Sequence, residues 1–279
     1  MVLEQIVADR VAALHADLGS MPAVLVAFSG GVDSGVVLAA AVRALGADRV
    51  VAATAVSASL PAAERTAARA FAAGLGVRHE EPSTDELARP DYVANSGARC
   101  FSCKAELMDT LRPLATELGI ADVATGTNAD DVVAGFRPGI RAAAERRART
   151  PLADAGMTKA DVRAAARAWG LPLADKPAAA CLASRIAYGV PVSAPRLARV
   201  EAAEVALRLA LADAGLTVRD LRVRDLGDRA RVELDAQLVP LVGPELLAVV
   251  RGFDTVELDP RGFRSGSMNE LLADPARYR

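Results

Sequence analysis

Hydrophobic residues along the chain fall into short, continuous runs that alternate with longer, alanine-rich stretches. The apolar runs are bounded by glycines or polar residues, which is typical of buried strands, and they cover residues 23–28, 50–56 and 121–125. Helical spacing or alanine-rich composition marks the stretches between them, at residues 1–19, 36–45, 61–75 and 104–118. Repeated strand–helix units predict an α/β fold with a parallel, doubly wound sheet, whose ligands gather at the C-terminal ends of the strands.

The pattern changes near residue 176. One long helix is predicted over residues 194–214, because Pro195 falls in its first turn and Gly215 lies just past its end. Shorter elements follow, with strands predicted at 221–226, 230–234 and 255–258 and a helix at 242–250. We therefore expect two domains, residues 1–175 with the parallel sheet and residues 176–279 with a smaller α+β fold.

A glycine-rich loop, Ser29-Gly30-Gly31-Val32-Asp33-Ser34, joins the first predicted strand to the first helix after it. Glycines let the backbone approach a ligand, and amide groups at a helix N-terminus favour an anion, so this loop is a candidate phosphate site. Ser29 and Ser34 add hydroxyl donors, and Asp33 could hold a hydrated Mg²⁺. The loop lacks the Gly-Lys-Ser/Thr ending of a mononucleotide P-loop and the glycine spacing of a dinucleotide site. A strand-to-helix turn without a ligand is the alternative.

The loop resembles the SGGxDS signature of the PP-loop ATP pyrophosphatases. The resemblance implies that ATP is split between its α and β phosphates, that pyrophosphate is held in the loop, and that AMP is placed on a carboxyl or carbonyl oxygen. It also implies that the adenine lies near Thr54 and Val56. Gly126 and Asp130 follow the third predicted strand and would complete the pocket, with Arg137 near the phosphates. Asp130 could instead only cap the next helix. Separately, Thr158 is a predicted N-cap for the helix that begins there.

The chain has three cysteines: Cys100 and Cys103 form a C-x-x-C pair, and Cys181 is far away in sequence. Such a pair can be a redox pair, half of a zinc site or part of an iron–sulfur site. A zinc site needs a fourth ligand, and no histidine is close in sequence; a redox pair has no use for a third cysteine. Three thiolates on a [4Fe–4S] cluster would leave one iron open to hold a sulfide.

The stretch around Cys181 is similar to a motif of the LarE family of ATP-dependent sulfur transferases. The likeness extends over nearly the whole chain, in the order SGGVDS, RCFSCK, GTNADD, FRPG, KPAAACLASR, LRVRDLGDRARVEL and GFRSGSMNE. The chain departs from the family pattern at Val132-Val133-Ala134-Gly135, where a polar stretch with an aspartate is expected. It also departs at Asp225-Leu226-Gly227-Asp228, where histidines are frequent.

The resemblance to this family implies a two-step reaction. ATP adenylylates a carboxylate of pyridinium-3,5-dicarboxylate mononucleotide with release of pyrophosphate, and sulfur then gives a thiocarboxylate for the nickel-pincer cofactor of lactate racemase. In one branch of the family the cysteine matching Cys181 gives up its own sulfur. In the other branch three cysteines hold a [4Fe–4S] cluster that carries the transferable sulfide. Because Cys100, Cys103 and Cys181 are all present, we favour the cluster branch, with Cys181 as a sacrificial donor as the alternative.

Charged residues beyond residue 180 are candidates for binding an anionic substrate. Ser184 and Arg185 directly follow Cys181, and arginine suits a bidentate phosphate contact. Arg222 and Arg224 share one face of a predicted strand and could form a basic wall. Salt bridges with Glu201 or Glu233, themselves candidate substrate residues, are the structural alternative.

Composition restricts the class of protein. Much of the 52% hydrophobic content is alanine, and no apolar run reaches the roughly 18–20 residues that span a bilayer, so we expect a soluble, cytoplasmic protein without a signal peptide. A net charge of −2 argues against a nucleic-acid partner. His15 and His79 lie in no motif. The alternatives are a PP-loop tRNA thiolase, an amidotransferase-type ligase, and a non-catalytic ATP-binding or iron–sulfur sensor. A sulfide or sulfur donor is required, and the resemblance suggests a homo-oligomer.

Overall fold

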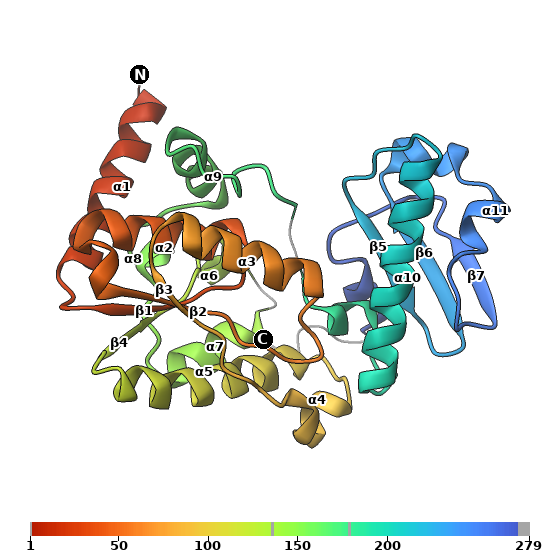
Figure 1. The fold of residues 1–279 in the computed structure, drawn as a ribbon, viewed down its shortest axis with the longest axis horizontal. Coiled ribbons are helices and arrows are strands. Elements are labelled where there is room, and N and C mark those ends of the chain that lie inside the picture. The colour runs from red at the N-terminus through yellow and green to blue at the C-terminus, as the bar shows by residue number, and fades with distance from the viewer. Residues whose placement is uncertain (1, 135–136, 178–179, 273–279) are drawn as a thin grey trace. The chain divides into compact units, whose positions relative to one another are not determined.

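The computed structural model describes residues 2–134, 137–177 and 180–272, and it divides the chain into two compact units (Figure 1). The first unit contains residues up to Glu86 together with those from Cys100 to 177, and the second contains residues 87–99 and those from Ala180 onward. The sequence-based boundary at 175/176 assigns residues 87–99 to the first domain, whereas the structure groups them with the second unit. Parts of two motifs, residues 135–136 and 178–179, lie outside the described residues.

A parallel sheet forms the centre of the first unit. Its strands are β1 (Val24–Ala27), β2 (Val50–Ala53), β3 (Arg78–Glu80) and β4 (Asp122–Ala124), in the order β3-β2-β1-β4. All three pairings are parallel. The predicted α/β fold with a doubly wound parallel sheet is therefore confirmed. The short edge strand β3 was not predicted, because its three polar residues carry no hydrophobic pattern.

Helices pack on both faces of this sheet. The helices of the first unit are α1 (Val2–Gly19), α2 (Val32–Leu45), α3 (Ala62–Gly74), α5 (Arg99–Glu117), α6 (Ala129–Val133), α7 (Pro138–Glu145), α8 (Pro151–Asp154) and α9 (Lys159–Ala168). In the described part of the chain, no helix combines the length and the apolar character that crossing a membrane requires. The predicted N-cap at Thr158 is confirmed, since its side chain accepts from Asp161 N in a capping box.

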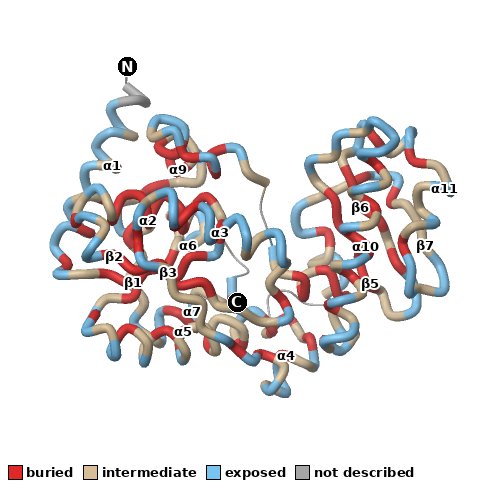
Figure 2. The backbone as a smooth tube through the Cα atoms, viewed as in Figure 1, coloured by how far each residue is buried: buried red, intermediate tan, exposed pale blue. Residues whose placement is uncertain are grey.

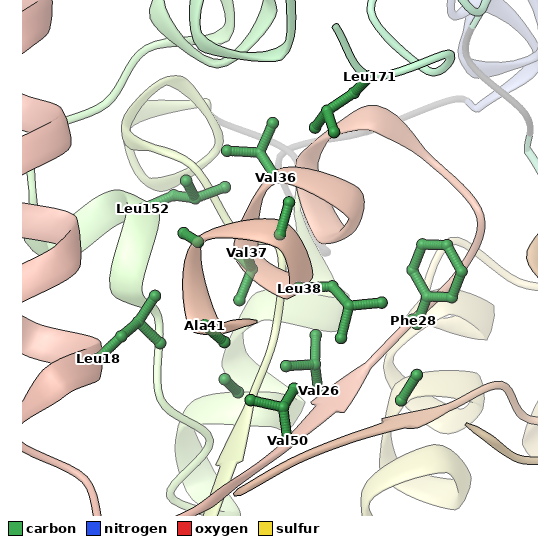
Figure 3. Packing of buried hydrophobic residues seen from close by; sticks show 14 of the residues in the cluster. Leu18, Val26, Phe28, Val36, Val37, Leu38, Ala41, Val50, Leu152 and Leu171 are labelled. Carbon is green, nitrogen blue, oxygen red and sulfur yellow. The ribbon is translucent and has the colours of Figure 1, made fainter. Parts of the chain in front are cut away.

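The two central strands of this sheet, β1 and β2, are buried on both faces, as Figure 2 shows. Val24 and Val26 pack in one hydrophobic core with α1, α2, α3, α8 and α9, and Leu25 and Ala27 pack in another with α5. This alternation follows from the period of two along a strand. Figure 3 shows Val36, Val37 and Leu38 of α2 among Leu18, Val26, Val50 and Leu152. The helix that follows the glycine-rich loop is thus fixed by apolar packing along its length.

The second unit is a small α+β fold. It contains α4 (Pro90–Val93), α10 (Ala194–Asp213), α11 (Pro244–Leu247) and a sheet of β5 (Leu221–Asp225), β6 (Arg229–Leu234) and β7 (Thr255–Leu258). The sheet order is β5-β6-β7, with β5 and β6 antiparallel and β6 and β7 parallel. Leu221 and Val223 share the core of this unit with Leu207 of α10, while Arg222 and Arg224 alternate with them. The helix predicted over 242–250 is shorter and begins at Pro244.

The segment of residues 87–99 is held in the second unit by side-chain hydrogen bonds to backbone carbonyls. Asn95 is fully buried, and its Nδ2 donates to Ala187 O at 2.8 Å and to Val190 O at 2.7 Å. Arg99 Nη1 donates to Ala183 O at 2.9 Å. Because these carbonyls belong to residues 183–190, the segment joins the part of the chain that carries Cys181 and Arg185.

His15 makes folding of the first unit dependent on pH. Its ring stacks on Trp169 with centroids 5.6 Å apart, and the guanidinium of Arg43 lies 4.5 Å from the same Trp169 ring. Burial, and then the charge of Arg43, lower the pKa of His15. Below its ordinary pKa of 6.5 the unfolded chain takes up a proton at His15 that the folded chain resists, so stability falls as pH falls through this range.

We therefore expect urea unfolding to give a smaller stability loss between pH 7.5 and pH 5.5 for His15→Phe than for the unsubstituted chain. Phenylalanine keeps the stacked ring and removes the titrating group. Since burial also lowers the pKa of His79, the unsubstituted chain must be compared with the variant at both pH values. An identical loss in both proteins would contradict the role of His15.

Candidate functional site

The glycine-rich loop has the geometry of an anion site. Gly30 lies in the left-handed region (φ +74°), which glycine adopts readily, and Gly31 is the N-cap of α2. Ser29 Oγ and Ser34 Oγ lie 3.1 Å apart, and Ser34 Oγ also donates to Gly31 O at 3.2 Å. These bonds hold the loop against the first turn of α2, a 14-residue helix. The first amide groups of this helix and its dipole favour negative charge.

Gly126 brings the end of β4 against this loop. A Cβ atom placed on Gly126 would lie 2.5 Å from Ser34 N and 2.9 Å from Ser34 Cα. Only glycine allows these two backbones to approach so closely. The structure therefore brings Gly126 together with Asp33 and Ser34, as expected for two loops at the carboxyl ends of adjacent strands.

Asp33 is bound by two side chains that the sequence analysis did not identify. Asn128 Nδ2 donates to Asp33 Oδ1 at 3.1 Å, and Lys159 Nζ pairs with Asp33 Oδ2. Asp130 Oδ2 in turn accepts from the backbone N–H of Lys159 at 2.8 Å. Asp130 thus lies inside α6, whose N-cap is Asn128, and contacts the N-terminus of the later helix α9. Asn128 lies in the GTNADD motif and could have been found there, whereas Lys159 had no local signal.

A second lysine, Lys176, also contacts the loop, although it lies far from the loop in sequence. Lys176 Nζ donates to Gly30 O at 2.9 Å and to Glu64 Oε2 of α3 at 2.6 Å. Both side chains of this ion pair are mostly buried, with 18% of Lys176 and 22% of Glu64 exposed. Neither residue was among the sequence-based candidates, although Lys176 opens the KPAAACLASR motif.

The other predicted nucleotide residues lie nearby but are engaged in bonds within the chain. Thr54 Oγ1 donates to Phe28 O at 2.8 Å and lies 2.8 Å from His79 Nε2, so it fixes the residue just before the loop. Val56 N donates to Pro82 O at 2.9 Å. Arg137 is 54% exposed and its Nε donates to Asp131 at 3.2 Å.

The cysteines lie at two places in the chain. Cys100 is exposed and Cys103 half-buried. Both lie in the first turns of α5, which begins before them rather than after Lys104 as predicted. Their i, i+3 spacing puts both on one helix face. Cys181 is half-buried and belongs to the second unit. Among the described residues, no group of three or more His, Cys, Asp or Glu side chains is arranged to hold a metal ion.

The backbone of Cys181 is fixed by the residues that follow it. Its carbonyl oxygen accepts from Ser184 Oγ at 2.7 Å and from Arg185 Nη1 at 3.0 Å. Arg185, with only 5% of its side chain exposed, also binds Glu204 through two bonds, Nε to Oε1 at 2.9 Å and Nη2 to Oε2 at 3.1 Å. Ser184 and Arg185 therefore position Cys181 in addition to any contact with a substrate.

Two further arginines lie beside Arg185. Arg224 Nη2 pairs with Glu233 Oε2 at 2.7 Å and donates to Ser267 Oγ at 3.1 Å, and its Nη1 donates to Ser184 O at 3.3 Å. Burial, and then the charges of Arg185 and Arg224, lower the pKa of Arg222 to about 10. Arg222 also lies over the Phe263 ring, 5.2 Å from its centroid. We call Arg185, Arg222, Arg224, Glu204 and Glu233 the arginine site.

Glu204 is a carboxylate of α10 in this site, whereas the sequence analysis named Glu201 of the same helix. Glu204 Oε1 also accepts from Val223 N at 3.1 Å, and the residue is buried, whereas Glu201, almost one turn earlier, is partly exposed. The helical pattern placed both residues on α10 but did not fix which of them faces Arg185.

Replacing Glu204 with alanine should lower the free energy of unfolding by about 3–5 kcal/mol, because it leaves the buried Arg185 without its charged partner. Glu201→Ala is the matched control and should cost about 1 kcal/mol or less. Urea unfolding of both variants measures the difference. Equal losses would show that the pair with Arg185 is not what makes Glu204 important.

Comparison with known proteins adds to this geometry. A model of the NAD synthase family matches residues 3–92. An uncharacterized protein of Synechocystis sp. is 42% identical over 261 residues, 91% of this chain and 94% of the relative. The pyridinium-3,5-bisthiocarboxylic acid mononucleotide synthase of Lactiplantibacillus plantarum is 35% identical over 272 residues, 95% of each chain. An uncharacterized protein of Methanocaldococcus jannaschii is 28% identical over 150 residues, about half of each chain. The first two relatives match this chain across both of its units.

Proposed function

Because the chain belongs to the LarE family of ATP-using sulfur transferases, we propose that it converts pyridinium-3,5-dicarboxylate mononucleotide to a thiocarboxylate for the nickel-pincer cofactor of lactate racemase. The observation that carries this proposal is the 35% identity to the L. plantarum synthase over 95% of the chain. That range covers both the glycine-rich loop and the arginine site. The proposed reaction needs both an anion loop for ATP and a basic site for an anionic substrate.

The first step is the activation of a substrate carboxylate. A carboxylate oxygen attacks the α-phosphorus of ATP, the bond to the β-phosphate oxygen breaks, and pyrophosphate leaves. Ser29, Gly30, Gly31 and Ser34 hold the phosphates through backbone and hydroxyl donors, and Gly126 keeps the loop in place. Thr54 and Val56 border the adenine. Mg²⁺, with Asp33 as its candidate ligand, would neutralise phosphate charge.

The substrate is an anion, and the arginine site is suited to it. Arg185, Arg222 and Arg224 are at least nine-tenths buried, and Arg222 has the neighbouring positive charges described above. A phosphate or carboxylate placed beside Arg222 would relieve this repulsion and make charge-assisted hydrogen bonds. We therefore assign substrate binding to this site, with Ser184 and Glu233 orienting the arginines.

The second step transfers sulfur to the activated carbonyl carbon, with AMP as the leaving group. A [4Fe–4S] cluster on Cys100, Cys103 and Cys181 would supply a bound sulfide. The number of cysteines and their match to the family's motifs support this route. The alternative is transfer of the Cys181 sulfur itself.

We further propose that the protein works in the cytoplasm and as a homo-oligomer. Support for the oligomer is that Val205 and Leu209, one turn apart on α10, are 52% and 62% exposed.

Anaerobically purified protein tests this function. With ATP, Mg²⁺ and the pyridinium substrate it should release pyrophosphate and form a product heavier by the replacement of oxygen with sulfur. Pyrophosphate release without the pyridinium substrate, or with tRNA instead, would contradict the assignment. Iron and acid-labile sulfide near four each per chain, lost in Cys103→Ala, would support the cluster route. A metal-free protein whose Cys181 loses the mass of H₂S during turnover would support the sacrificial route.

A further inference from the structure

Lysine is rare in this chain. Of its 33 basic residues only three are lysines, Lys104, Lys159 and Lys176, and all three belong to the first unit. Arginine supplies every other basic side chain. Two of the three lysines contact the glycine-rich loop. The basic side chains bonded to this loop in the described part of the chain are therefore lysines, in a chain whose other basic side chains are arginines.

Lys176 lies directly against the turn of the loop. Its ammonium donates to Gly30 O, and a Cβ atom placed on Gly30 would lie 3.7 Å from Lys176 Nζ and 3.5 Å from Glu64 Oε2. The Glu64 carboxylate is its charged partner in the structure. The ammonium is thus held beside the backbone that the phosphates are proposed to contact.

Lys159 reaches the other end of the loop. It is the first residue of α9, and its backbone N–H is bound by Asp130 at 2.8 Å, which fixes where the side chain begins. Its ammonium pairs with Asp33 of the loop, and 39% of the lysine side chain is exposed. A ligand that enters the loop can therefore reach this ammonium.

The loop itself has too little positive charge to balance the triphosphate of ATP, so cations from other parts of the chain are needed. Residues 29–34 contain one carboxylate and no basic side chain, whereas the triphosphate of ATP carries several negative charges. The N-terminus of α2 contributes only about half a positive charge. Within the described ranges, Lys159 and Lys176 are the basic side chains bonded to residues 29–34. Arg137, the basic residue predicted from the sequence, pairs with Asp131 in the structure; its contact with the phosphates stays a prediction.

We propose that Lys159 and Lys176 bind the triphosphate of ATP, each exchanging the carboxylate that holds it in the structure for a phosphate. The proposal rests on the proposed use of ATP. A lysine ammonium suits such an exchange because it is a compact charge with rotatable donors on a flexible stem. The planar guanidinium of an arginine instead favours one fixed, bidentate geometry with its partner. Exchange at Lys159 leaves the Asp33 carboxylate for Mg²⁺, which prefers oxygen ligands.

Amine labelling of the unsubstituted protein tests this directly. Cleavage after arginine places the three lysines on separate peptides, so mass spectrometry can follow each of them. We expect saturating ATP or pyrophosphate with Mg²⁺ to lower the labelling rate of Lys159 and Lys176 at least threefold, and AMP to have little effect. A free amine in the same tube corrects for loss of reagent. If ATP binds and neither lysine is protected, the proposal is wrong.

Binding measurements on variants give a second test. Lys159→Gln and Lys176→Gln should each raise the Kd for ATP and for pyrophosphate about tenfold or more, and leave the Kd for AMP within about twofold. Arg167→Gln is the matched control, because it removes an exposed charge from α9 that pairs with Asp175. Melting temperatures identify any misfolded variant.

The two proposals fail in different ways. Unchanged ATP affinity in both lysine variants overturns the inference on Lys159 and Lys176 and leaves the proposed function intact. An unsubstituted protein that binds no ATP overturns the proposed function and the inference together. ATP binding with lysine protection but no thiocarboxylate product overturns only the proposed sulfur transfer.

Discussion

Cys181→Ala should form thiocarboxylate at least about a thousandfold more slowly than the unsubstituted protein, while substrate-dependent pyrophosphate release stays within about threefold. Cys181 is the thiol that both proposed sulfur routes require, as a cluster ligand in one and as the donor in the other. The ATP loop lies elsewhere in the chain, so activation of the carboxylate does not depend on this thiol. The measurement is a parallel assay of pyrophosphate and of the sulfur-containing product.

Cys181→Ser is the matched control for shape. It keeps the size of the side chain and the backbone carbonyl that Ser184 and Arg185 bind, and removes only the sulfur. We expect it to fail as Cys181→Ala does. Retained product formation in either variant would exclude Cys181 from sulfur transfer. Cys103→Ala then separates the routes, because it should stop the cluster route and leave the sacrificial route running.

Gly126→Ala should weaken ATP binding about a hundredfold or more and lower the free energy of unfolding by about 1–3 kcal/mol. The added Cβ atom would meet only backbone atoms, at 2.5 Å from Ser34 N, 2.9 Å from Ser34 Cα and 3.0 Å from Asp33 C. No rotamer change can relieve such a contact, so the end of β4 or the first turn of α2 must move. Isothermal titration with ATP and urea unfolding measure the two effects.

Gly74→Ala is the matched control for this substitution. A Cβ atom there has no neighbour within 4 Å, and the residue lies at the exposed end of α3. Its stability should stay the same or rise slightly, because alanine favours a helix more than glycine does. If Gly126→Ala binds ATP as tightly as Gly74→Ala does, the close approach of β4 to the loop is not needed for the nucleotide.

The structural features predicted best from the sequence are those set by residues close together along the chain. The buried strands at 24–27 and 50–53, the loop between strand and helix, and the Thr158 cap all follow from local spacing and composition. The parallel direction of the strands followed from the alternation of strands and helices. These features are set by periodicity, which a single sequence displays directly.

The parts that were missed depend on contacts between distant residues. Lys159 and Asp33 are 126 positions apart, and Lys176 and Gly30 are 146 positions apart, so no spacing rule connects them. Glu204 was missed for a different reason. A helix pattern with alanine on several faces leaves its rotation about the axis undetermined, so the buried Glu204 could not be distinguished from the partly exposed Glu201.

The segment of residues 87–99 limits how this protein can be dissected. A fragment that starts at residue 180 would lack Asn95 and Arg99, and the carbonyls of Ala183, Ala187 and Val190 would lose the donors they have in the intact chain. A fragment that ends at residue 177 would carry the same segment without the residues it binds. The two units are therefore interleaved in sequence, and neither corresponds to one uninterrupted stretch of the gene.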